Sequence, residues 1–77
     1  MDDEFDKDAF LKRYGAHIRK VRRSRGYSQD RLALEAGLGS GTLSKIEAGI
    51  VDPQVSTIVK IADTLGVPLS KLFEFRR

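Results

Sequence analysis

The spacing of hydrophobic residues predicts a helical chain. Apolar residues recur every three or four positions, the spacing of one face of an amphipathic helix, and no segment shows the alternation of a β-strand. Over residues 8–25 this face consists of Leu11, Tyr14, Ile18 and Val21, with basic residues around the rest of the helix. Gly26 is placed to end it. We therefore expect a first helix over residues 8–25.

Glycine residues divide the rest of the chain into four further segments. Ser28 is placed to cap a second helix that ends at Gly37, and Gly49 follows a third helix expected over about 40–48. A fourth helix is predicted over 55–65 and a last short helix over about 69–75. In the fourth helix the core-facing positions are expected to be Val55, Ile58, Ala62 and Leu65. Five short helices can bury their apolar faces only by packing together, so we predict an all-α, compact five-helix domain.

Length and composition favour one small soluble domain. The chain has 77 residues and no cysteine, which excludes disulfides and thiolate metal sites. Residues 1–8 are acidic and are expected to form a flexible leader before a domain over 9–77. The start of the chain lacks the basic and apolar pattern of a secretory signal, and no apolar run approaches the ~18 residues that span a bilayer. We expect a cytoplasmic protein that does not contact membranes.

The charge is distributed unevenly along the chain. The net charge is +3, but residues 1–8 carry five acids and one lysine, which leaves thirteen Lys and Arg against six acids in the remainder. Seven of these basic residues lie between Lys12 and Arg25. Such an excess attracts polyanions, of which nucleic acid is the commonest. On charge alone, a solvated helix face that keeps the protein soluble is an equally good interpretation.

The sequence offers no set of residues for catalysis or metal binding. His17 is the only histidine, and no thiol, phosphate-binding loop or carboxylate pair beside a histidine accompanies it. The glycines at 39 and 41 follow no strand, so they are not a dinucleotide-binding fingerprint. We expect no enzyme activity, no cofactor and no metal.

The segment from Ser28 to Gly49 carries the functional signal. It consists of two short predicted helices joined by Gly37-Leu38-Gly39, the arrangement of a helix-turn-helix unit. In DNA-binding units of this kind the second helix enters the major groove and the first lies across the backbone.

Over about residues 10–75 the sequence resembles the phage-repressor-like (Cro/Xre-type) helix-turn-helix family. The matching motifs are Ile18-Arg19-x-x-Arg22, Gly26-Tyr27-Ser28-Gln29-x-x-Leu32-Ala33-x-x-Ala36-Gly37-Leu38, Thr42-Leu43-Ser44-Lys45-Ile46-Glu47-x-Gly49, Asp52-Pro53, Ile58-x-x-Ile61-Ala62-x-x-Leu65-Gly66-Val67 and Leu72-Phe73. The resemblance implies a lambda-repressor-like fold and a transcriptional regulator that binds double-stranded DNA as a homodimer. The alternative is a protein–protein adaptor, such as an antitoxin-like module, built on the same fold.

The resemblance also implies roles for single residues. The implied DNA-binding residues are Gln29, Ser40, Gly41, Thr42, Ser44 and Lys45. Gln29 would bind a phosphate at the start of the second helix, where exposed N–H groups also favour an anion. Thr42 would lie near the backbone and the other four would face the major groove. Arg22 and Glu47 would form an internal ion pair. Gln29 could also be an ordinary first residue of a helix, and Lys45 an ordinary solvated lysine.

Three departures from the family pattern change the expected recognition. Gly39 and Gly41 stand where relatives carry side chains, so Lys45 is the only long donor on the groove-facing side and either Gly39 or Ser40 would cap the third helix. We expect modest direct base readout, led by Lys45 on a guanine, with DNA shape and phosphate contacts supplying the rest. The loop at 50–52 is apolar and then acidic, so Ile50 and Val51 could belong to a subunit contact.

One such domain makes too few contacts for tight specific binding, so a dimer that reads a pseudo-palindromic operator is expected. The chain shows no separate dimerisation or ligand-sensing domain, which leaves the domain itself to supply the interface. The last helix is more apolar than a small core requires, and its candidate interface residues are Leu69, Leu72, Phe73 and Phe75. The alternative for Leu69 and Leu72 is that they close the core beside Phe10.

Overall fold

The computed structural model describes residues 5–76, and it is all-helical as predicted. Its elements are α1 (Lys7–Ser24), α2 (Gln29–Ala36), α3 (Thr42–Ala48), α4 (Val55–Leu65) and a final 3₁₀ helix, η1 (Leu69–Phe73). The predicted count of five α-helices is therefore wrong, because the last element is a 3₁₀ helix. Its hydrogen bonds join residues three apart, from Lys71 N–H to Pro68 O at 2.9 Å and from Glu74 N–H to Lys71 O at 3.4 Å.

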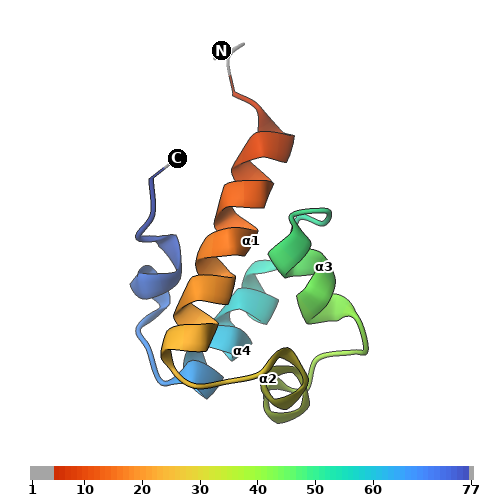
Figure 1. The fold of residues 1–77 in the computed structure, drawn as a ribbon, viewed down its shortest axis with the longest axis vertical. Coiled ribbons are helices and arrows are strands. Elements are labelled where there is room, and N and C mark those ends of the chain that lie inside the picture. Colours follow the sequence, from red (N-terminus) through yellow and green to blue (C-terminus); the bar gives the residue numbers. More distant parts are fainter. Residues whose placement is uncertain (1–4, 77) are drawn as a thin grey trace.

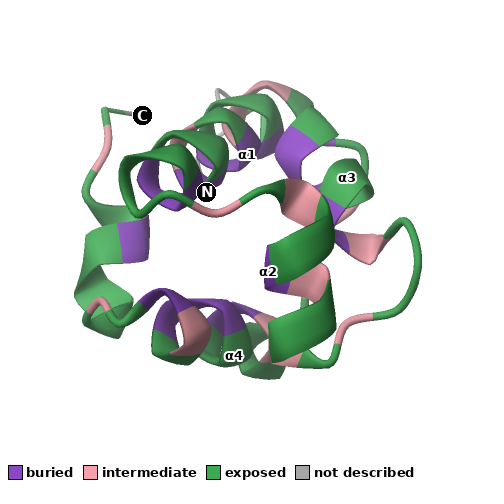
Figure 2. Cartoon of the chain, turned by 60° about the horizontal axis from the view of Figure 1, so that its bottom comes forward, coloured by how far each residue is buried: buried purple, intermediate pink, exposed green. Residues whose placement is uncertain are grey.

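The long α1 is the axis around which the other elements pack. Figure 1 shows α3 on one side of α1 and η1 on the other, with α2 across its lower end. Contacts join α1 to α3 and η1, and α2 to α3 and α4. The buried sides of α1, α2 and α4 face one another across the domain (Figure 2). The largest fully buried side chains are Ile18, Leu32, Leu43, Ile61, Leu65 and Leu72.

The first helix begins and ends slightly earlier than predicted. Asp6 is its N-cap, with a side chain that accepts from Ala9 N–H at 3.1 Å, and a carboxylate at this end also complements the helix dipole. Lys7 and Asp8, expected in the flexible leader, instead form the first turn of α1. The rest of that leader, residues 1–4, lies outside the described residues.

The third helix is shorter than predicted because a left-handed glycine precedes it. Gly41 is its N-cap at φ +82°, a conformation that favours glycine, and the helix begins at Thr42. Ser40 and Gly41 thus lie in the turn before α3, and neither Gly39 nor Ser40 is the cap. Gly41 also escapes the stability cost of a glycine inside a helix.

Two apolar positions were predicted on the wrong side of the surface. Val55, expected in the core, is 71% exposed, and Ile61 is buried in α4 in its place. Leu72, a candidate interface residue, is 0% exposed and belongs to the core. The tight turn of η1 directs Leu72 inward while it leaves Leu69 and Phe73 at the surface.

The position of α3 depends on an unusually close crossing with α1. A Cβ atom on Gly15 would lie 2.3 Å from the Ile46 carbonyl oxygen and 2.7 Å from that of Glu47. At the end of α3, a Cβ on Gly49 would lie 2.6 Å from the Lys12 Cα atom. Each helix thus supplies one glycine at which the other backbone sits against it. Neither contact leaves room for a methyl group.

Replacement of Gly15 by alanine tests this crossing. At an ordinary helix position Gly→Ala stabilises by about 0.8–1 kcal/mol. Here the new methyl group would push α3 away, so we expect Gly15→Ala to destabilise by about 1–3 kcal/mol in urea unfolding. The neighbouring exposed position supplies the control, since Ala16→Gly should cost only the ordinary propensity difference. A stabilising Gly15→Ala would contradict the close crossing.

Candidate functional site

One side of α3 is anchored in the core and the other faces solvent. Leu43 and Ile46 are each 2% exposed and fix the inner side of the helix. Ser44 and Lys45 lie on the outer side and are exposed. The Ser44 hydroxyl donates to the Gly41 carbonyl at 2.9 Å, which ties the first turn of α3 to the preceding loop.

The predicted DNA-binding residues do not all lie on the helix itself. Ser44 and Lys45 belong to α3, whereas Ser40 and Gly41 are exposed in the turn that leads into it. Thr42 is half-buried at the first position of the helix. Together they form one continuous stretch from the turn to the second turn of α3.

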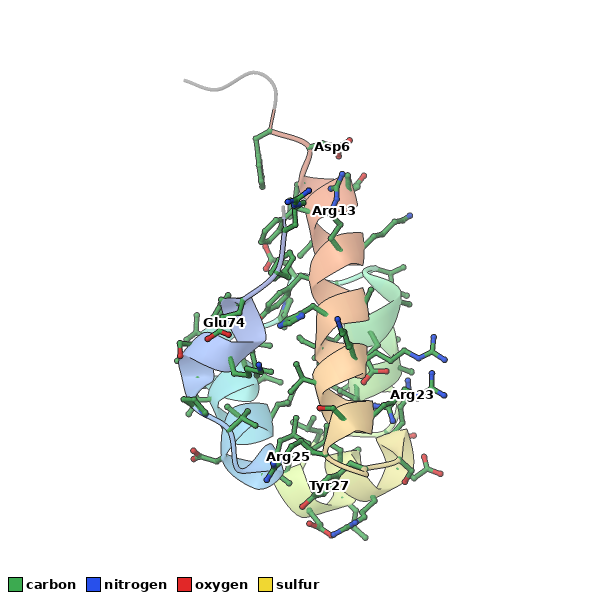
Figure 3. The ribbon with its side chains drawn as sticks, turned by 60° about the vertical axis from the view of Figure 1, so that its left-hand side comes forward. Asp6, Arg13, Arg23, Arg25, Tyr27 and Glu74 are labelled. Atoms are coloured by element: carbon green, nitrogen blue, oxygen red, sulfur yellow. The ribbon has the colours of Figure 1, made fainter. Side chains whose placement is uncertain are left out.

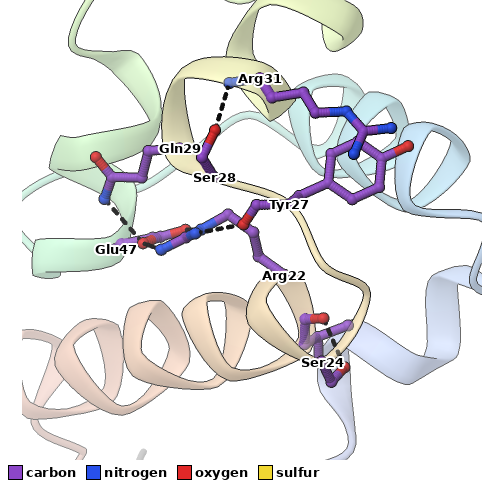
Figure 4. Close-up of polar contacts among 8 residues, drawn as sticks. Arg22, Ser24, Tyr27, Ser28, Gln29, Arg31 and Glu47 are labelled. Carbon is purple, nitrogen blue, oxygen red and sulfur yellow. Dashed lines mark hydrogen bonds and ion pairs between the residues drawn. The ribbon is translucent and has the colours of Figure 1, made fainter.

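A buried ion pair holds α3 against α1. Arg22 Nε donates to Glu47 Oε2 at 2.7 Å and Arg22 Nη2 donates to Glu47 Oε1 at 3.0 Å, a two-point contact between planar groups (Figure 4). The two side chains are only 8% and 3% exposed. The pair whose existence the family resemblance implies is therefore present in the fold. It links the end of α1 to the end of α3.

The same ion pair reaches α2 through two further hydrogen bonds. Arg22 Nη1 donates to the Tyr27 carbonyl at 2.7 Å, in the loop that leads into α2. Gln29 Nε2 donates to Glu47 Oε1 at 2.9 Å (Figure 4). The carboxylate of Glu47 thus binds groups from α1 and α2 at once. We call Arg22, Glu47 and Gln29 the buried polar cluster.

This cluster determines how the Gln29 amide is oriented. A carboxylate only accepts hydrogen bonds, so the NH₂ group of Gln29, and not its oxygen, must face Glu47. The second N–H of that NH₂ group is not used by Glu47 and is available to a further acceptor. Gln29 is the first residue of α2, and Ser28 caps this end by accepting from Arg31 N–H at 3.1 Å. The side chain predicted to bind phosphate is therefore held at the positive end of a helix dipole.

The sequence analysis missed Arg19 as a site residue. An open groove of about 350 Å³ lies where the first three helices meet, and its lining residues are Arg19, Arg22, Gln29, Ser44, Glu47 and Ala48. Arg19 precedes Arg22 by three residues, which places both on adjoining parts of the same helix side. That spacing was the available signal, but only the fold shows that α2 and α3 border this side.

Side chains on α2 bind it to the rest of the domain. The Tyr27 hydroxyl donates to the Thr64 carbonyl of α4 at 3.1 Å. The guanidinium of Arg31 lies 4.1 Å from the centre of the Tyr27 ring, and Arg31 Nε donates to Glu35 at 2.9 Å. The hydrogen bond and negative charge of Glu35 raise the pKa of Arg31 above its ordinary value. These contacts keep α2 in place without using groups on its groove side.

The candidate interface residues divide into exposed and buried ones. Leu69 and Phe73 are 39% and 51% exposed, whereas Leu72 lies in the core. Phe75 is half-buried and packs against Tyr14, with ring centres 5.6 Å apart. Burial raises the pKa of the Tyr14 hydroxyl to about 12, as expected for a phenol in an aromatic cluster.

His17 has a structural environment. Its Nε2 lies 2.8 Å from the Lys71 carbonyl oxygen, and its ring stacks on Phe75 with ring centres 5.3 Å apart. Within residues 5–76, no group of three or more His, Asp or Glu side chains is arranged to hold a metal ion. None of the described helices combines the length and apolarity needed to cross a membrane.

Comparison with known proteins identifies the domain type. The model of the helix-turn-helix family HTH_3 matches residues 18–72. The HTH-type transcriptional regulator SlrR of Bacillus subtilis is 43% identical over 61 residues, which are 78% of this chain and 40% of SlrR. The transcriptional repressor RstR of the Vibrio cholerae cryptic phage CTXphi is 32% identical over 59 residues, 77% of this chain and 53% of RstR. The chain thus spans about half or less of the length of these curated relatives.

A solved structure matches over nearly its whole length. The restriction-modification controller protein C.AhdI from Aeromonas hydrophila superposes with a TM-score of 0.81 at 31% sequence identity. The match covers 84% of this chain and 98% of that protein. A Vibrio cholerae transcriptional regulator of the HTH_3 family gives a TM-score of 0.79 at 31% identity, over 88% of this chain and 38% of that one.

The energetic role of the buried polar cluster can be measured by removing one charge. Arg22→Met leaves the Glu47 carboxylate buried without a cation, so we expect a loss of about 3–5 kcal/mol in urea unfolding. The exposed Arg13 on the same helix provides the control, and Arg13→Met should change stability by less than about 0.5 kcal/mol. The double variant Arg22→Met/Glu47→Met removes both charges and should recover part of the loss. Equal effects of Arg22→Met and Arg13→Met would rule out a structural role for the pair.

Proposed function

Because this chain belongs to the Cro/Xre-type helix-turn-helix family, we propose that it regulates transcription by binding double-stranded DNA in a sequence-specific manner. The observation that carries this proposal is the two-sided character of α3. Its inner side is locked by Leu43, Ile46 and Glu47, and its outer side presents Ser44 and Lys45 to solvent. In the proposed complex α3 lies in the major groove, which is wide enough to admit a helix.

Base recognition in this proposal depends mainly on Lys45. It is the only long donor among the groove-facing residues, and a lysine donates well to the O6 and N7 acceptors of guanine. Ser44 and Ser40 supply short hydroxyl contacts, and Gly41 lets the turn approach the bases closely. Gln29 binds a backbone phosphate at the start of α2. Much of the affinity then comes from phosphate contacts and DNA shape.

We assign the dimer contact to an apolar face that the single chain leaves exposed. Its residues are Val55 and Val59 on α4, 71% and 37% exposed, and Leu69 and Phe73 on η1. Val55 and Val59 are four residues apart and share one side of α4. Val55 and Phe73 line the same hollow, so the two elements form one continuous surface. A two-fold contact through this face would present two copies of α3 to successive major grooves.

Selection of bound sequences from a random duplex pool tests the proposal most broadly. We expect an enriched two-fold related site whose half-sites are separated by about one helical turn of DNA, ~34–36 Å. Binding should weaken with added salt, with a slope near −0.9 per phosphate contact in a log–log plot. No enriched sequence and no tight duplex binding at any salt concentration would instead favour a protein–protein adaptor.

Two substitutions separate base contacts from phosphate contacts. Lys45→Ala should relax discrimination at one base pair per half-site, by about 1–3 kcal/mol, because it removes the main base donor. Gln29→Ala should weaken binding to all duplexes by a similar factor, because a phosphate carries no sequence information. Both are measured by fluorescence anisotropy on the selected site and its single-base variants. Lys60→Ala, on the exposed side of α4, is the control and should change neither quantity.

The dimer face can be tested without disturbing the core. Phe73→Glu places a charge in the apolar face, so sedimentation velocity should show a monomer and operator affinity should fall. The thermal transition should remain cooperative, because Phe73 is half-exposed in the single chain. Leu34→Glu adds the same charge at an 82% exposed leucine of α2 and should leave the dimer intact. A Phe73→Glu protein that stays dimeric would move the interface elsewhere.

A further inference from the structure

The groove at the junction of α1, α2 and α3 has a positive charge that the domain itself does not use. Three of its lining residues are charged: Arg19, Arg22 and Glu47. Arg22 and Glu47 neutralise each other at 2.7 Å and lie almost entirely inside the protein. Arg19 is exposed, and within residues 5–76 it takes part in no ion pair. The groove therefore presents one uncompensated positive charge to solvent.

The opposite wall of the same groove supplies a hydrogen-bond donor. Gln29 comes from the start of α2, and Glu47 holds its NH₂ group so that one N–H bonds to the carboxylate and the other is unused by it. Arg19 comes from the middle of α1, and Ser44 from α3 lines the groove beside both. A guanidinium on one wall and an amide donor on the other match the oxygens of a tetrahedral anion.

Arg19 belongs to a basic stripe that follows α3. Lys12 is seven residues before Arg19 and Arg23 is four residues after it, so the three share one side of α1. Lys12 lines the hollow beside residues 49–52 at the end of α3. Figure 3 shows Arg23 projecting from α1 on the side where α3 lies. The basic residues Arg13 and Lys20 lie about a third of a turn further round, away from the groove.

We infer that Arg19 and Gln29 together hold one phosphate of the DNA backbone in this groove. The inference rests on the proposed function and extends it, because it gives α1 a direct contact with the ligand. It also makes Glu47 a positioning residue for DNA binding, since the carboxylate orients the Gln29 amide toward the phosphate that Arg19 binds. The helix-turn-helix unit would then grip the backbone from two helices on either side of one phosphate.

Arg19→Gln and Arg13→Gln provide a matched comparison. Each removes one positive charge from an exposed position of α1, so a general electrostatic effect would change both equally. We expect Arg19→Gln to weaken binding to the selected duplex by roughly tenfold at low salt and to reduce the log–log salt slope by about 0.9. Arg13→Gln should leave the slope unchanged. Thermal unfolding should show that both variants are folded.

Neutral methylphosphonate linkages then locate the phosphate. Replacing the phosphates one at a time should reveal one position per half-site at which wild-type binding falls but Arg19→Gln and Gln29→Ala binding falls much less. This non-additivity marks a direct contact. Equal salt slopes for wild-type and Arg19→Gln, or full additivity at every phosphate, would overturn the inference while the proposed function stands. Absence of salt-dependent duplex binding by the wild-type protein would overturn both.

Discussion

The carboxylate of Glu47 is the constraint on which the rest of the structure depends. It is nearly inaccessible to solvent, yet it stays ionised beside Arg22 and also accepts from Gln29. A buried charge is tolerated only when its partners are in place, so the ends of α1, α2 and α3 must meet at this point. The geometry of the unit is thus determined by one group that cannot be left without its donors.

The glycine contacts act in the same direction as this polar cluster. Gly15 and Gly49 let the backbones of α1 and α3 approach closely, which brings Arg22 within bonding distance of Glu47. Close approach, a satisfied charge and two buried apolar anchors together leave α3 little freedom to move. A rigid helix is what groove recognition requires, because each base contact depends on a fixed side-chain origin. Stability and recognition are therefore properties of the same few contacts in this domain.

Much of the fold could be predicted from the sequence because its signals are local. The three-and-four spacing identified the helices, and the glycines marked their ends. The ion pair followed from a family resemblance, not from any local pattern. The start of α3 was misplaced because the preference of Gly41 for a left-handed conformation depends on the turn around it. Val55 and Leu72 were misjudged because periodicity gives the apolar side of a segment but not the depth at which neighbours cover it.

The candidate site was predicted less completely for a related reason. Residues on α3 could be nominated from a motif, whereas Arg19 enters the site only because α2 and α3 border its side of α1. That relation joins residues far apart in the sequence and has no local signature. The same holds for the exposed apolar face, which combines α4 with the short η1 segment.

The most direct test of the central claim is a duplex titration followed by NMR of the labelled protein. The side-chain Nε–H of Arg22 should exchange slowly with solvent before and after duplex is added, because it is bonded to Glu47 inside the fold. The side-chain amide of Gln29 and the backbone amides of Ser44 and Lys45 should shift on binding. A rapidly exchanging Arg22 Nε–H, or shifts confined to α4 and η1, would contradict the account.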